Sequence, residues 1–151
     1  MKLSEIDPDI ALAELLDGRI AVQTSATKSY TVKVYSENAQ PNVGLDNEFV
    51  RVRANGNPDP QTRGADGFGL WNGNVMVEIL CKSNSDGTIK RRRNNSLISQ
   101  IEEALGMGVT HERFFFRLDE NNPITPTTPN LTNGYYTTIL NVWWRNRPNK
   151  Q

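Results

Sequence analysis

The sequence is poor in the side chains that most often build catalytic and metal centres. Its 151 residues include one cysteine and one histidine, which excludes an internal disulfide and leaves few nitrogen or sulfur ligands for a metal. His111 stands alone in a link between two expected elements, where solvated histidines are common. Cys81 falls on the apolar phase of an expected strand, which favours a buried thiol over a reactive one. We therefore expect no catalytic residue, no metal site and no cofactor.

The sequence also lacks an excess charge of either sign. Lys plus Arg and Asp plus Glu number 17 each, so no global field draws the protein toward nucleic acid or an anionic membrane. No apolar stretch approaches the length of a membrane span, and the first residues carry acids where a secretory signal needs an apolar run. We expect a single domain over residues 1–151, made in the cytoplasm and without a membrane partner.

The first third of the chain predicts a short helix followed by strands. Asp7 and Pro8 suit the start of a helix, and Gly18 suits its end. Valines then alternate with arginines around residue 50, which predicts a half-buried strand with one charged face. The expected strands cover residues 18–24, 30–35 and 49–53.

The remainder predicts three more strands around one longer helix. Apolar residues recur at helical spacing from Leu97 to Leu105, in a helix that begins near residues 94–96 and stops at Gly106. Strands are expected at residues 75–82, 114–118 and 135–145, the last with two largely apolar faces that suit a central strand or one covered by a neighbouring subunit. The predicted fold class is α+β: a mostly antiparallel sheet with one main helix packed on one face, a short N-terminal helix and two long loops.

Both long loops carry large apolar residues. Residues 54–74 are rich in glycine and turn signals, and residues 119–134 are too long for an ordinary hairpin. A merely solvated linker has little use for such side chains, so they either fold back onto their own domain or dock on another chain. As candidate contacts with a second subunit or a neighbouring protein, we select Phe68, Leu70, Trp71, Ile124 and Leu131.

One concentrated charge run precedes the main helix. Lys90, Arg91, Arg92 and Arg93 repel one another and the positive end of the helix, so the run is unfavourable unless anions lie nearby. Three interpretations remain open: a solvated hairpin end, salt bridges between subunits, and contact with DNA phosphates. We assign these four residues to an interface or a DNA channel.

Taken in chain order, the expected elements resemble the small neck proteins of tailed bacteriophages, namely the tail terminators and the tail-completion or head–tail joining proteins. The resemblance rests on the order of the elements, on the strand at residues 75–80 leading into the helix at 98–101, and on the segment 133–144. It covers most of the chain and involves no invariant motif.

The resemblance implies a non-enzymatic virion protein. It implies a ring of commonly six copies that caps the tail tube, joins it to the head connector on the portal side, and leaves a channel through which DNA passes without sequence readout. A competing interpretation is a ligand-binding or host-directed inhibitory α+β domain. The ring predicts self-association, whereas the competing domain predicts a stable monomer.

Overall fold

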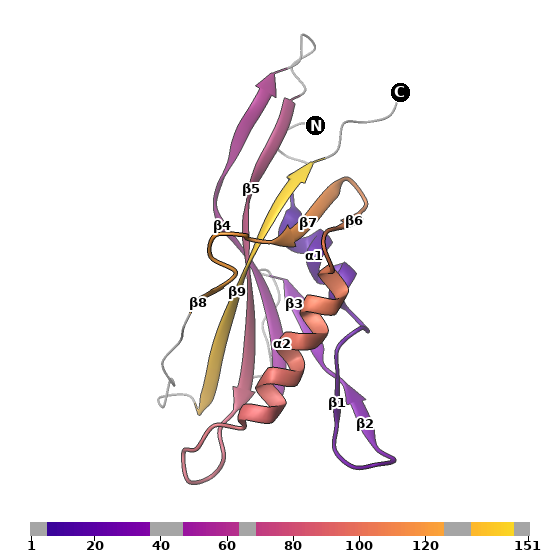
Figure 1. The fold of residues 1–151 in the computed structure, drawn as a ribbon, viewed down its shortest axis with the longest axis vertical. Coiled ribbons are helices and arrows are strands. Elements are labelled where there is room, and N and C mark those ends of the chain that lie inside the picture. Colours follow the sequence, from indigo (N-terminus) through magenta and orange to yellow (C-terminus); the bar gives the residue numbers. More distant parts are fainter. Residues whose placement is uncertain (1–5, 37–46, 64–68, 126–133, 147–151) are drawn as a thin grey trace.

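The structure is a computed structural model that describes residues 6–36, 47–63, 69–125 and 134–146. Within these segments the chain forms two helices and nine strands, and it has the predicted α+β class with a mostly antiparallel sheet (Figure 1). The elements are α1 (Pro8–Leu16), β1 (Ala21–Gln23), β2 (Ser29–Thr31), β3 (Lys33–Ser36), β4 (Glu48–Arg63), β5 (Gly69–Lys82), α2 (Arg91–Leu105), β6 (Val109–His111), β7 (Phe114–Leu118), β8 (Ile124–Thr125) and β9 (Tyr135–Asn146).

The main sheet of the described chain has seven strands. Six of the strands follow the order β3-β4-β5-β9-β7-β6. The seventh, β8, lies off this path and pairs with β9. Only the β3–β4 pair in this described sheet is parallel, with Val34 opposite Val50. The predicted strand 30–35 is divided at Val32, because β2 pairs with β1 in a separate two-stranded sheet while β3 joins the main one.

Both helices cover one face of the sheet, and the main core lies between them and that face. The sheet residues of this core alternate along their strands, as Val75, Val77 and Ile79 do on β5. The predicted central position of the last strand is confirmed, because β9 lies between β5 and β7. The core includes Leu12, Leu16, Val50, Val52, Val75, Val77, Ile79, Leu97, Ile101, Leu105, Leu140, Val142 and Trp144.

The opposite face of the sheet carries a smaller cluster and a buried ion pair. Phe49, Leu80 and Tyr135 are buried together, with the Phe49 and Tyr135 rings edge to face at 5.5 Å. The buried Glu78 carboxylate accepts hydrogen bonds from Arg51 and Arg53 on the neighbouring strand. The predicted charged face of the strand at 49–53 is therefore confirmed, and its charge is partly neutralised within the sheet.

The prediction of an irregular loop at residues 54–74 is wrong for most of its length. Residues 54–63 continue β4 and residues 69–74 belong to β5, paired as a long antiparallel hairpin that projects beyond the other strands (Figure 1). Register shifts between Asn55 and Asp59 and between Pro60 and Thr62 absorb the glycine and proline residues that suggested a loop. Strand pairing satisfies the backbone there, and local turn propensity is overridden.

Of the second predicted loop, residues 119–134, the structure describes residues 119–125 and 134, and Ile124–Thr125 form β8 there. The start of this loop is held against β9, since the Asn141 side chain donates hydrogen bonds to the Asn122 carbonyl and the Thr125 hydroxyl, both at 2.9 Å.

Neither helix of the described chain has the length and apolar character needed to cross a membrane.

Candidate functional site

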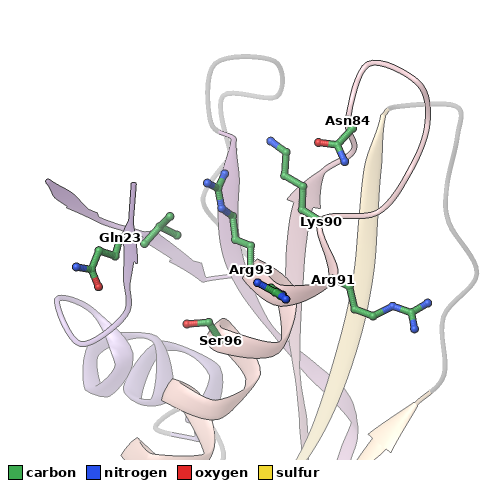
Figure 2. A pocket seen from close by; sticks show the side chains of 8 residues that line it. Gln23, Asn84, Lys90, Arg91, Arg93 and Ser96 are labelled. Carbon is green, nitrogen blue, oxygen red and sulfur yellow. The ribbon is translucent and has the colours of Figure 1, made fainter. Parts of the chain in front are cut away.

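A concave feature with converging charge lies at the start of α2. A groove of about 660 Å³ is lined by side chains from β1, from the turn after β5 and from the first turns of α2. Figure 2 shows Gln23 on one side of it and Lys90 and Arg91 on the other. We call it the basic groove, and its lining residues are Val22, Gln23, Asn84, Lys90, Arg91, Arg92, Arg93 and Ser96.

The predicted start of the main helix is one turn too late. α2 begins at Arg91, so the basic run forms the N-cap and first turn of the helix and does not precede it. No side chain caps this helix, and its first turn contains no acid. Asn94 is not a cap, because it is buried and its amide donates to the Thr138 hydroxyl at 3.0 Å. The first turn therefore combines the positive helix end with four cations.

A buried carboxylate offsets one of these cations. Glu48, whose side chain is 0% exposed, accepts a hydrogen bond from Arg93 at 2.7 Å and another from the Tyr30 hydroxyl. Partial burial by itself lowers the pKa of Arg93, but the hydrogen bond and charge of Glu48 outweigh it and raise that pKa. Burial, followed by the bond to Glu48, raises the pKa of Tyr30 above its ordinary value. This network fixes the first turn of α2 to β2 and β4.

Cys81 lies beside the same network and is buried, as predicted. Its thiol contacts the Asn94 side-chain oxygen at 3.8 Å, and it lies opposite Glu48 on the neighbouring strand. Burial, with a further contribution from the Glu48 charge, raises the pKa of Cys81 to about 12. The thiol is therefore protonated at neutral pH and is not a nucleophile there.

The other three cations of the run have no carboxylate partner among the described residues. Arg91 and Arg92 are exposed, and Lys90 is half-buried at the N-cap. An anion in the basic groove would meet guanidinium and ammonium donors, the helix end and the polar side chains of Asn84 and Ser96. The groove is therefore suited to a phosphate or a carboxylate from outside the chain.

The structure places the apolar interface candidates in different environments. Ile124 is 42% exposed on β8, at an edge of the sheet, which keeps it available to a partner. Trp71 lies on β5 and packs partly against its own core, which favours the first of the two alternatives for this residue. Leu70, next to it, is half-buried. Phe68 and Leu131 lie outside the described residues.

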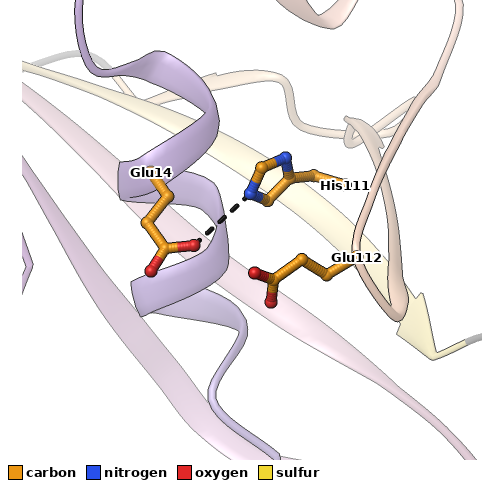
Figure 3. A group of neighbouring side chains, drawn as sticks. All are labelled: Glu14, His111 and Glu112. Atoms are coloured by element: carbon orange, nitrogen blue, oxygen red, sulfur yellow. Dashed lines mark hydrogen bonds and ion pairs between the residues drawn. The ribbon is translucent and has the colours of Figure 1, made fainter.

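The fold also brings together a group that sequence reasoning missed. Glu14 on α1 lies beside His111 and Glu112 at the turn between β6 and β7, with the three potential ligand atoms within 4.8 Å of one another (Figure 3). His111 and Glu112 are adjacent in the sequence, but Glu14 is nearly a hundred residues away. Only the packing of α1 beside this turn, which no local pattern encodes, could have revealed the group.

Comparisons with known proteins identify the fold and no more. No protein-family model matches the chain, and no curated protein matches it. A solved structure whose name carries no functional description aligns with 80% of this chain and 83% of its own, with a TM-score of 0.53 and 12% sequence identity. At that identity the likeness shows a shared fold.

Proposed function

We propose that this chain is a structural virion protein that forms a ring in the neck of a tailed phage. In that ring it caps the tail tube, joins it to the head connector, and leaves a channel for DNA. The observation that carries the proposal is the basic groove, where Lys90, Arg91 and Arg92 have no carboxylate partner within the described chain. Four cations around a helix end repel one another and the helix dipole, and since one internal carboxylate neutralises one of them, an external anion would stabilise the other three.

The projecting β4–β5 hairpin supports the same proposal. Beyond the point where Asn72 pairs with Arg145, β9 no longer accompanies β5. The hairpin continues as a two-stranded ribbon, which is marginal by itself in water. An arm of this kind is suited to pack against a neighbouring copy or against a tail or connector protein. Ile124, exposed on β8, offers a second apolar contact.

The mass and the shape of the assembled protein test the proposal. Native mass spectrometry and negative-stain electron microscopy of the purified protein, alone and with tail tubes, should show a closed oligomer with a central opening, with six copies expected. Rings that form only on tubes also support the proposal. A protein that stays monomeric at high concentration and does not bind tube ends would overturn it.

Charge reversal examines the groove itself. Arg91→Glu with Arg92→Glu should leave the fold intact, because exposed charges seldom carry much stability, and should abolish ring assembly or DNA binding. DNA contact predicts that log affinity falls with log salt by about 0.9 per phosphate neutralised. Bridges between subunits predict that salt weakens ring assembly while DNA binding is absent. A double variant that assembles and binds DNA as the parent does would remove the groove from the proposal.

The volume of the basic groove also favours a second candidate function. About 660 Å³ is enough for a small anionic ligand, which fits a ligand-binding or host-directed inhibitory domain that acts as a monomer. Saturable binding of one small anion by a stable monomer, abolished by the same double reversal, would establish this alternative in place of the ring.

A further inference from the structure

We propose that Glu14, His111 and Glu112 form a binding site for a divalent transition metal of the Zn²⁺ type. The three side chains come from α1 and from the β6–β7 turn, and one potential ligand atom from each lies within 4.8 Å of the other two. Figure 3 shows the carboxylate of Glu14 directed toward the His111 ring, with Glu112 beside it. The site lies outside the basic groove and shares no residue with it.

The distance between the Glu14 and His111 side chains matches the spacing that a metal requires. The His111 Nε2 and Glu14 Oε2 atoms are 3.4 Å apart, which is long for a hydrogen bond. In a tetrahedral site with metal–ligand bonds of about 2.0–2.1 Å, two donor atoms lie about 3.3 Å apart. The Glu112 side chain is exposed and within 4.8 Å of this pair, and metal binding requires its carboxylate to approach to the same distance. Three protein ligands then leave a fourth position for water.

The charge and the donor types indicate the class of ion. With a neutral imidazole, two carboxylates in close proximity carry a charge of −2, which a divalent cation neutralises. An imidazole nitrogen is a good ligand for Zn²⁺ and related transition metals, whereas Mg²⁺ and Ca²⁺ prefer oxygen. The buried Cys81 thiol cannot compete for the metal, because its pKa is raised to about 12 and it lies in the core.

A bound ion would connect α1 to the β6–β7 turn. Those two segments already pack together, so the metal would stabilise a contact that exists without it. Because the ion binds only where the folded chain gathers all three ligands, added Zn²⁺ should raise the unfolding temperature.

The single histidine supplies a direct measurement. Untagged protein is titrated with Zn²⁺, following the ¹⁵N-coupled imidazole resonances of His111 by NMR and the heat of binding by calorimetry. We expect the imidazole signals to shift and to saturate at one equivalent. Mg²⁺ at the same concentrations should leave them unchanged, and an equal response to Mg²⁺ would overturn the assignment of the ion class.

Three variants identify the carboxylate ligands. Glu14→Gln and Glu112→Gln should each weaken Zn²⁺ binding at least tenfold, whereas the matched control Glu120→Gln, an exposed carboxylate paired with Arg117, should leave it unchanged. Circular dichroism confirms that each variant is folded. If Zn²⁺ does not shift the His111 resonances, or if both Gln variants bind as tightly as the parent, the site does not exist. This outcome is independent of whether the protein forms a ring.

Discussion

At the scale of single residues, the buried carboxylate of Glu48 is the most consequential group near the basic groove. Its side chain is inaccessible to water and depends on Arg93 and the Tyr30 hydroxyl for compensation. A buried carboxylate that loses its cation retains its desolvation cost without the attraction that offset it. The Arg93 guanidinium therefore stabilises the fold, while its neighbours Arg91 and Arg92 remain available to a partner.

This difference predicts unequal effects for two neighbouring arginines. Arg93→Met should lower the free energy of unfolding by about 2–4 kcal/mol, because it leaves the Glu48 charge buried without its cation. Arg92→Met, one residue earlier in the same helical turn, should change it by less than about 0.5 kcal/mol. Urea denaturation at neutral pH measures both values. Equal losses in the two variants would mean that the Arg93–Glu48 pair is unimportant for stability.

At the scale of elements, the connection from α2 to β6 depends on a glycine in an unusual conformation. Gly108 has a φ of +142° and its amide donates to the Leu105 carbonyl at 3.0 Å, in the short link between the end of the helix and the next strand. A Cβ atom at this position would lie 2.2 Å from the Phe115 ring. That ring lies edge to face with Trp143 and under the Arg145 guanidinium, so a shift of the ring would disturb both contacts.

We therefore predict that Gly108→Ala lowers the free energy of unfolding by about 2–4 kcal/mol, from backbone strain together with the collision. Gly87→Ala is the matched control. Gly87 also has a positive φ, +84°, but nothing lies within 4 Å of its Cβ position, so only the strain of about 1–2 kcal/mol applies. Thermal and urea unfolding of the two variants separate the cost of backbone strain from the cost of the collision with the Phe115 ring. A loss at Gly108 no larger than that at Gly87 would show that the Phe115 ring yields without cost.

At the scale of the whole molecule, the core and the projecting hairpin are separable. The buried apolar residues lie under the two helices and in the small cluster around Phe49, while among the described residues the end of the hairpin pairs only with itself. If the protein functions as a ring, folding should therefore depend on the core, and assembly should depend on the projecting hairpin.

Shortening the hairpin tests this separation. Removing residues 61–70 and joining Pro60 to Trp71 through Asn-Gly should shift the unfolding temperature by only a few degrees, because it keeps Trp71 against the core and preserves the pairing of β5 with β9. Ring assembly, followed by native mass spectrometry, should be lost. A shortened chain that still closes the ring would show that the hairpin is not the contact, and one that does not fold would show that it belongs to the core.

The sequence by itself determined the class of fold and most of the element positions. Alternating apolar residues predicted the strands at 49–53 and 75–82, and helical spacing predicted the helix ending at Leu105. These predictions succeeded because side-chain periodicity records which face of an element is buried. The buried state of Cys81 followed from the same periodicity.

Only the tertiary structure decided what depends on contacts between distant segments. Glycine and proline in residues 54–74 favoured a loop, but strand pairing along β5 made most of it a hairpin. α2 begins at Arg91, earlier than predicted, and Asn94 does not cap the helix because its side chain binds Thr138. Arg93 is neutralised by Glu48, which lies on a strand that is distant in the sequence. The Glu14, His111 and Glu112 group has the same origin. Local patterns report burial and propensity, but they do not report which distant charges and donors the folded chain places side by side.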